Sequence, residues 1–343
     1  MLFHCTAVSR GLGSDVVRYQ HDSEHIAAFG NAPRYSTYNA NLNDMKTVGF
    51  IGLGSMGLPM SRHLLSAGFE TRGFDLREPA RAAFETAGGK AAASSADAAR
   101  LADALVLMVV NAVQVEDALF HDGALKALPE GATVILGSTC SPAFVRALAK
   151  RVQAAGRNFL DAPVSGGLVG AEAGTLTIMA AGPMDVFEAA LPILQSFGDK
   201  IFHVGAHPGQ GAAMKTLNQL LCGVHAAAAA ETLAFAEKLG VDGKMALQVL
   251  SGSAAASWML RDRGPRMMQA EPGVTSAVDI FVKDLGIVLD AGRDVKAALP
   301  LAAAAYQMFV STSAGGGGNA DDSQVIRSYR LLNGSRQRGE SGD

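Results

Sequence analysis

Two patterns of hydrophobic positions divide the chain near Gly209. From about residue 46 to residue 204, short aliphatic runs alternate with stretches whose apolar positions recur every three to four residues. Short aliphatic runs are typical of strands buried on both faces of a parallel sheet, and the longer period is typical of the helices that cover such a sheet. Beyond Gly209 only the helical period continues. The pattern therefore predicts an α/β fold, in which a doubly wound sheet is followed by an all-α C-terminal domain.

The expected elements follow from these runs. Strands are predicted at 47–51, 71–74, 104–110, 133–136, 159–160, 175–180 and 200–204, and helices at 58–67, 113–119, 142–155, 184–195, 212–239, 242–251, 276–292, 298–312 and 321–332, with a further helix starting near Pro79. Residues 1–44 and 335–343 follow neither period, which predicts a disordered extension before Met45 and a solvated tail. We accordingly expect one domain over 45–208 and a second over 209–334, joined by the long helix at 212–239.

A glycine-rich turn follows the first predicted strand. Its residues are Gly52, Leu53, Gly54, Ser55, Met56 and Gly57, and a helix is predicted directly behind them. In such a unit the first glycine makes the tight turn, the second lets a pyrophosphate approach the backbone, and the third lets helix and strand pack closely. This arrangement predicts a Rossmann-type dinucleotide-binding domain.

The second predicted strand leads to Asp75, which bears on the choice of cofactor. It stands about twenty residues beyond the turn, where a carboxylate can accept both ribose hydroxyls of NAD and repel the 2′-phosphate of NADP. We therefore predict NAD as the cofactor, although the nearby Arg77 opposes this preference. An aspartate at a strand end can also cap the next helix, and that alternative stays open.

Polar residues follow three later strands of the predicted sheet. Asn111 and Thr139 come just after two aliphatic runs, and a loop with Ser165, Gly166 and Gly167 follows the next strand. Because the carboxyl ends of strands are where doubly wound sheets bind ligands, Asn111 and Thr139 are candidates for cofactor or substrate contact. The amides of the glycine loop and the Ser165 hydroxyl suit a substrate carboxylate. Ordinary turn and capping chemistry would explain the same residues.

The long helix at 212–239 carries a lysine among apolar neighbours. Lys215, Asn218, Cys222 and His225 step by three, four and three, so they share one stripe of the helix. An unpaired buried ammonium is destabilising, so a lysine in such surroundings either reaches water or serves chemistry. Taken alone, a solvated lysine is the simpler interpretation, but the glycine turn upstream favours chemistry.

Composition limits the partners. The net charge is -3 and no cluster of Lys or Arg stands out, so neither nucleic acid nor an anionic membrane is expected as a partner. The three cysteines lack CxxC spacing, and Gly205 and Pro208 disfavour a helix that would bring His203 and His207 together, so no disulfide framework and no metal site are expected. No apolar run approaches the roughly 20 residues of a membrane span. We expect a soluble, cytoplasmic homo-oligomer that acts on a small molecule.

Four spaced motifs resemble those of the β-hydroxyacid dehydrogenase family. They are GLGSMG at 52–57, DAPVSGG at 161–167, GxGxxxKxxN at 209–218 and FVKDLG at 281–286, and the resemblance covers roughly residues 46–332. It implies that Lys215 is the catalytic acid/base, that Asn218 orients the substrate, and that the loop with Ser165, Gly166 and Gly167 binds it. It also implies that Thr139 and Lys283 lie next to the cofactor, and that the glycine turn and Asp75 form the dinucleotide site.

Finer details resemble the L-threonate dehydrogenase branch of this family. They are VVNA at 109–112, LLCGVH at 220–225, SWM at 257–259 and VDIFVKDLG at 278–286. In 3-hydroxyisobutyrate dehydrogenases and tartronate semialdehyde reductases, Leu-Pro usually stands where this chain has Val109-Val110. The resemblance implies NAD-dependent oxidation of a small hydroxy acid. The first expectation is oxidation of L-threonate to its 2-oxo acid. The activities of 3-hydroxyisobutyrate dehydrogenase and tartronate semialdehyde reductase are the alternatives. A non-catalytic NAD sensor would have no reason to keep Lys215 with Asn218, and an imine reductase would be expected to replace the lysine.

Overall fold

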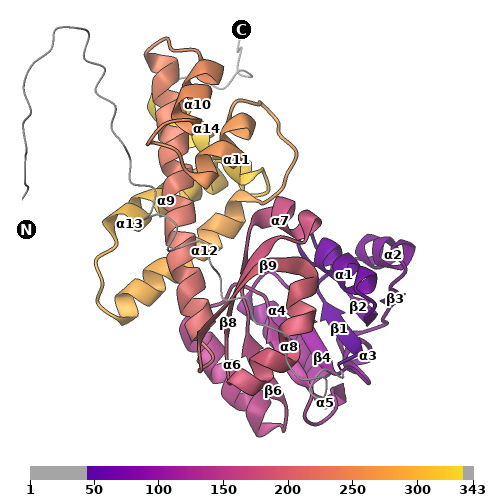
Figure 1. The fold of residues 1–343 in the computed structure, drawn as a ribbon. Coiled ribbons are helices and arrows are strands. Elements are labelled where there is room, and N and C mark those ends of the chain that lie inside the picture. Colours follow the sequence, from indigo (N-terminus) through magenta and orange to yellow (C-terminus); the bar gives the residue numbers. More distant parts are fainter. Residues whose placement is uncertain (1–44, 335–343) are drawn as a thin grey trace, which may run out of the picture. The chain divides into compact units, whose positions relative to one another are not determined.

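The computed structural model describes residues 45–334, which are coloured from indigo to yellow in Figure 1. The expectations for residues 1–44 and 335–343 lie outside the described residues. The strands are β1 Thr47–Ile51, β2 Glu70–Phe74, β3 Lys90–Ala91, β4 Ala104–Leu107, β5 Thr133–Leu136, β6 Asn158–Asp161, β7 Val164–Ser165, β8 Leu176–Ala181 and β9 Gly198–Gly205.

Within the described residues, these strands form a single sheet in the order β3-β2-β1-β4-β5-β6-β8-β7, with β9 paired to β8. The pairs from β3 across to β6 are parallel, β8 runs antiparallel to β6 and β7, and β9 runs parallel to β8. The strand order reverses between β1 and β4. In doubly wound sheets, ligands bind beyond the carboxyl ends of strands at such a reversal.

The helices fall into two groups along the chain. The first group is α1 Gly57–Ser66, α2 Glu78–Thr86, α3 Ser95–Ala99, α4 Ala112–Glu116, the π-helical η2 Asp117–His121, α5 Ala124–Ala127, α6 Pro142–Ala154, α7 Gly167–Ala173 and α8 Met184–Phe197. The second group is α9 Gln210–Lys238, α10 Gly243–Ser251, α11 Trp258–Met267, α12 Val278–Asp294, α13 Pro300–Thr312, the π-helical η3 Ser313–Gly317, the 3-10 turn η4 Asp322–Val325 and α14 Ile326–Leu332.

Apolar side chains fill both faces of the sheet. One cluster joins Leu105 and Val134 to residues of α3, α5 and α6, and the other joins Phe50 and Val106 to residues of α1, α2 and α8. Because both faces are buried, these strands carry continuous apolar runs, as the sequence predicted. A separate cluster holds the helices after β9 together around α9.

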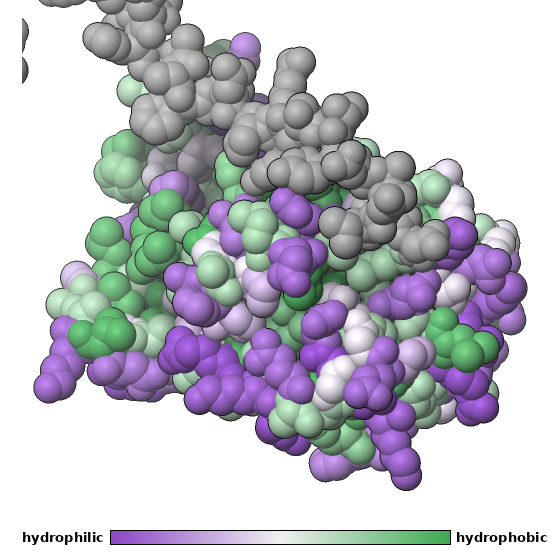
Figure 2. Space-filling view, turned by 60° about the horizontal axis from the view of Figure 1, so that its bottom comes forward, coloured by the Kyte–Doolittle hydropathy of each residue, from purple (hydrophilic) through white to green (hydrophobic). Residues whose placement is uncertain are grey.

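The long helix α9 connects the sheet to the helical region. It contacts β8, β9 and α6 of the sheet region and α10 to α14 of the helical region (Figure 1). Among the described helices it alone is long and apolar enough to cross a membrane by length and composition, and half of its most apolar stretch is buried inside the protein. Helices buried at the centre of soluble domains pass the same test. On the face shown in Figure 2, hydrophilic residues lie between small groups of hydrophobic ones.

The structure differs from the predicted elements in two instructive places. The strand expected over 104–110 ends at Leu107, because the N–H of Val109 bonds to Ser138 Oγ at 2.9 Å and that of Val110 to Gln114 Oε1 at 2.8 Å. The helix α11 was not predicted, since Gly264 and Pro265 interrupt its pattern. The first difference arises from hydrogen bonds to side chains beyond the strand, and the second from residues that are rare inside helices, so apolar periodicity reports neither.

Candidate active site

The glycine turn after β1 has the geometry of a dinucleotide site. Gly52 has a φ of 96°, and a Cβ there would lie 2.4 Å from the carbonyl oxygen of Met108. A Cβ on Gly57 would lie 1.8 Å from the carbonyl oxygen of Gly52. Around Gly54 the space is open except for Arg77 Nη2, which lies 3.5 Å from the Cβ position. Gly52 and Gly57 therefore leave no room for a side chain where helix and strand pack, whereas the backbone at Gly54 is accessible to a pyrophosphate. The residues of the turn thus fit NAD.

Asp75 follows β2 and is tied to this turn. Its Oδ2 accepts a hydrogen bond from the N–H of Leu53 at 2.9 Å, and its Oδ1 accepts from the N–H of Arg77 at 2.9 Å and from Arg77 Nε at 3.1 Å. Burial alone would raise the pKa of Asp75, but the bonds from Arg77 and Leu53 outweigh it and hold the pKa below its usual range. The helix α2 begins after Arg77 without any side-chain cap, so Asp75 does not cap it.

Asn111 and Thr139 lie beyond the carboxyl ends of β4 and β5. Asn111 is the N-cap of α4, because its Oδ1 accepts a hydrogen bond from the N–H of Gln114 at 3.0 Å. Thr139 presents its carbonyl oxygen to Lys283 Nζ of α12 at 3.4 Å. Both residues thus have a structural task, and their contact with the cofactor stays a prediction.

A buried carboxylate fixes the start of α9 to the sheet. Asp161 Oδ2, at the end of β6, accepts hydrogen bonds from the N–H groups of Gly209 at 2.9 Å and Ala212 at 2.8 Å. Burial raises the pKa of Asp161 to about 6, against the opposing effect of these backbone N–H groups. A Cβ on Gly211 would lie 2.4 Å from the carbonyl oxygen of Met179, so the helix and the sheet approach this closely only at a glycine.

Lys215 lies in the second turn of α9 and is only 7% exposed. The alternative of a solvated lysine therefore does not hold. Burial lowers the pKa of Lys215, while the nearby Asp284 carboxylate acts in the opposite direction. A lysine whose pKa is lowered can give up and take back a proton nearer neutral pH, which is what a general acid/base requires.

One helical turn further on, Asn218 connects α9 to the predicted substrate loop. Its Oδ1 accepts a hydrogen bond from Ser165 Oγ at 3.3 Å, and its Nδ2 donates to Gln219 Oε1 at 2.8 Å and lies 3.4 Å from Cys222 Sγ. The structure thereby brings Ser165 and Asn218 together, although they are far apart in the sequence. His225, the last member of the stripe, is exposed and has no part in this group.

The same hydrogen-bond chain continues into α12. Gln219 Nε2 donates to Asp284 Oδ2 at 2.5 Å, and Lys283 Nζ donates to Asp284 Oδ1 at 2.5 Å and to the carbonyl oxygen of Thr139. Asp284 is 3% exposed, so the ion pair is largely shielded from water. Elements that are distant in the sequence are therefore linked by one continuous chain that runs from Ser165 of the predicted substrate loop to Thr139, beyond the end of β5.

The glycines of the loop approach α11. Gly166 and Gly167 have φ values of 128° and 62°, and a Cβ on Gly167 would lie 3.9 Å from the Trp258 ring and 4.0 Å from Arg263 Nη1. Arg263 is buried and donates to both carboxylate oxygens of Asp322, at 3.0 and 2.9 Å. Trp258 and Arg263 thus border the loop, and the sequence assigned no role to the arginine.

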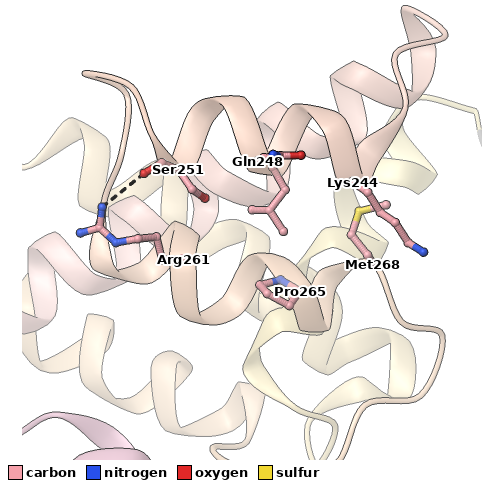
Figure 3. Close-up of a pocket in the computed structure, with 7 residues that line it drawn as sticks. Lys244, Gln248, Ser251, Arg261, Pro265 and Met268 are labelled. Carbon is pink, nitrogen blue, oxygen red and sulfur yellow. Dashed lines mark hydrogen bonds between the residues drawn. The ribbon is translucent and has the colours of Figure 1, made fainter.

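A separate cavity of about 470 Å³ lies between α10 and α11 (Figure 3). It is lined by Lys244, Leu247, Gln248, Ser251, Arg261, Pro265 and Met268. Arg261 Nη1 donates to the carbonyl oxygen of Ser251 at 3.5 Å across one end of it. None of the predicted site residues lines this cavity.

Comparison with known proteins agrees with this arrangement. Residues 47–205 match the family model of the NAD binding domain of 6-phosphogluconate dehydrogenase, and residues 209–329 match that of the NAD-binding domain of NADP-dependent 3-hydroxyisobutyrate dehydrogenase. The L-threonate dehydrogenase of Cupriavidus necator is 43% identical over 285 residues, which is 83% of this chain and 96% of that protein. The chain belongs to the β-hydroxyacid dehydrogenase family. This β-hydroxyacid dehydrogenase is also similar to a crystal structure of 3-hydroxyisobutyrate dehydrogenase from Salmonella typhimurium, with 41% sequence identity and a TM-score of 0.78. The match covers 82% of the present chain and 99% of the Salmonella chain.

The fold and the enzyme class of this β-hydroxyacid dehydrogenase are as the motifs predicted. It is an NAD-dependent enzyme with a Rossmann-type sheet and a helical C-terminal region. Three residues of the site went unnoticed in the sequence: Gln219, Asp284 and Arg263. The only available signals were the position of Asp284 in FVKDLG and of Gln219 directly after Asn218, and neither reveals that the two side chains meet.

Proposed function

We propose that the chain oxidises L-threonate to its 2-oxo acid with NAD⁺ as the acceptor, with Lys215 as general acid/base. The observation that carries the proposal is Lys215, buried and with a lowered pKa, one helical turn before Asn218, which bonds to Ser165 of the loop. The choice of L-threonate is supported by relatives of that name in Cupriavidus necator and Escherichia coli, at 43% and 40% identity.

The proposed reaction removes a hydride from the alcohol carbon and a proton from its hydroxyl group. Bound NAD⁺ supplies the hydride acceptor. Neutral Lys215 Nζ takes the hydroxyl proton as the carbon–oxygen double bond forms, and the ammonium returns the proton in the reverse direction. Burial favours the neutral amine before reaction, and Asp284 stabilises the ammonium afterwards. Asn218 aligns the substrate oxygen, and the loop at Ser165–Gly167 holds the substrate carboxylate.

Two related activities are the alternatives, namely 3-hydroxyisobutyrate dehydrogenase and 2-hydroxy-3-oxopropionate reductase. A relative with the second name in Escherichia coli is 33% identical. The test is NAD⁺ reduction by the purified protein on L-threonate, 3-hydroxyisobutyrate, glycerate and 3-hydroxypropionate side by side. We expect the highest kcat/KM on L-threonate. A higher value on 3-hydroxyisobutyrate or glycerate would reassign the substrate, and no turnover on any of them would refute the proposal.

We further propose that the enzyme works in the cytoplasm as a homo-oligomer. The support for the homo-oligomer is a row of exposed apolar side chains along one side of α9 and its C-cap residue: Met214, Leu217, Leu221, Phe235 and Leu239 are between 42% and 62% exposed. Their spacings are three, four, fourteen and four residues, which places them within about 60° of one another around the helix. The exposed His225 and Thr232 interrupt this stripe, which leaves an apolar group towards each end of the helix. Exposed apolar groups on one side of a helix are typical of a surface that a second subunit covers.

A further inference from the structure

The cavity between α10 and α11 has an apolar middle (Figure 3). A Cβ on Gly264 would lie 2.4 Å from Leu247 Cδ1, and a Cβ on Gly243 would lie 2.2 Å from Met268 Cε. The side chains of Leu247 and Met268 therefore lie against backbone that carries no side chain, which allows the two helices to pack closely. Together with Pro265, they form the apolar part of the lining.

A positively charged side chain lies towards each end of this cavity. Figure 3 shows Lys244 beside Met268 at one end and Arg261 beside Ser251 at the other. Arg261 Nη1 donates to the carbonyl oxygen of Ser251, which follows Lys244 by seven residues on α10. Seven residues of an α-helix span about 10 Å, so the two charged side chains are attached about that far apart along the cavity.

Neither of these cations has an acidic partner in the described part of the chain. None of the residues that line the cavity is acidic, and the two cations form no ion pair within residues 45–334. The nearest acidic residues in sequence are engaged elsewhere, because Asp262 accepts hydrogen bonds from Arg263 and Arg266, and Asp242 caps α10. Single unpaired cations are ordinary on a surface, but two of them at the ends of an apolar cavity favour a negatively charged ligand.

We propose that this cavity binds a linear dianion with an apolar stem, of the class of medium-chain dicarboxylates. One carboxylate pairs with Lys244 and the other with Arg261, while the methylene groups between them cover the apolar part of the lining. A cavity of about 470 Å³ has room for such a molecule. Because none of the predicted site residues lines the cavity, the inference goes beyond the proposed function and does not depend on it.

The first test compares ligands that differ in charge and length. Suberate, octanoate and succinate are titrated into the full-length protein, and binding is followed by saturation-transfer difference NMR. We expect suberate to bind with a Kd on the order of 1 mM. Octanoate lacks one charge and should bind about threefold more weakly, and succinate is too short to reach both cations and should bind more weakly still. Octanoate or succinate binding as tightly as suberate would overturn the proposal.

The second test removes the two charges. Lys244→Met and Arg261→Met keep most of each aliphatic stem, so each should weaken suberate about threefold, and the double variant about tenfold. Lys126→Met is the matched control, because Lys126 lines a different cavity, of about 340 Å³, and its loss should leave the affinity at the wild-type value. A melting temperature for each variant separates loss of folding from loss of binding. Wild-type affinity in the double variant would overturn the proposal.

A further variant separates this cavity from the predicted substrate site. Suberate carries carboxylates, which the proposed substrate site would also attract. Lys215→Met removes the buried ammonium of that site and leaves the cavity between α10 and α11 unchanged. We expect Lys215→Met to bind suberate as the wild type does. A loss of affinity in Lys215→Met as large as that in the double variant would place suberate in the substrate site and overturn the inference.

Discussion

Two opposing effects act on the pKa of Lys215. Burial in α9 disfavours its charged form, and the Asp284 carboxylate favours it. An unpaired buried ammonium would be neutral over most of the accessible pH range, and a directly bonded ion pair would keep it charged. The present arrangement lies between these limits, which suits a group that must exist in both forms during each turnover.

The first prediction tests this role. Lys215→Ala should lower kcat by roughly 10²- to 10⁴-fold, because a proton-transfer group is lost, while NAD binding and melting temperature stay near wild type. Lys215→Arg should not restore kcat, since arginine keeps the charge but does not give up a proton near neutral pH. Steady-state kinetics at saturating substrate and cofactor measure the effect. Near-wild-type kcat in the arginine variant would show that the lysine only supplies charge.

A second prediction at this scale concerns Asp75. The wild type should use NAD⁺ in preference to NADP⁺, because the ionised carboxylate repels a 2′-phosphate. Asp75→Ala should reduce that preference by at least about tenfold, since it also releases Arg77, which bonds to this carboxylate, to meet the phosphate. The measurement is kcat/KM for both cofactors. Arg77→Ala is the complementary variant, and equal use of both cofactors by the wild type would contradict the assignment.

At the scale of the secondary-structure elements, one buried side chain holds the start of α9. Asp161 accepts the hydrogen bonds of Gly209 and Ala212 at its first turn, and the pKa of this carboxyl is raised by burial to about 6. A helix N-terminus normally favours a carboxylate, so burial and the helix act against each other here. The pH dependence of stability can show which effect is larger.

The third prediction follows from the sign of this shift. Because the folded state holds the Asp161 proton more tightly than the unfolded state, the contribution of this group to the free energy of unfolding is largest below about pH 4 and is lost as the pH rises through about 6. Asp161→Asn keeps an oxygen acceptor but cannot ionise. Between pH 4 and pH 7 the free energy of unfolding of the wild type should therefore fall, relative to that of the variant, by up to about 3 kcal/mol. A shift in the opposite direction, in urea unfolding followed across this range, would mean that the helix N-terminus dominates.

Most elements were predictable because their signals are local. The turn at Gly52–Gly57 and the strands β1 and β5 are defined by residues next to one another, and α9 by a long apolar period. The short helix α7 was not predicted, because Gly166 and Gly167 at its start are typical turn residues. Gln219 and Asp284 could not be identified, since their roles depend on contact between α9 and α12, some 65 residues apart in sequence. Local patterns thus indicate elements and motifs, while side-chain networks arise only when the elements pack.

At the scale of the whole molecule, the exposed apolar stripe of α9 predicts assembly. Leu221→Glu with Phe235→Glu should shift the protein to a smaller species in sedimentation velocity, because two buried charges would face a partner subunit. Leu301→Glu is the matched control, since Leu301 is 68% exposed on α13 and lies outside the stripe. An unchanged sedimentation coefficient in the double variant would place the subunit contact elsewhere or show that there is none.

The anchor of α9 at Asp161 has a mechanical consequence. A helix of 29 residues is about 43 Å long, and Lys215 stands about 8 Å from its anchored end. If the helical region tilts by about 5° around that anchor, the far end of α9 moves by about 4 Å and the lysine by less than about 1 Å. Lys215, the proposed proton acceptor, therefore lies close to the point about which such a tilt would turn. A movement of this kind would leave Lys215 nearly in place relative to the sheet.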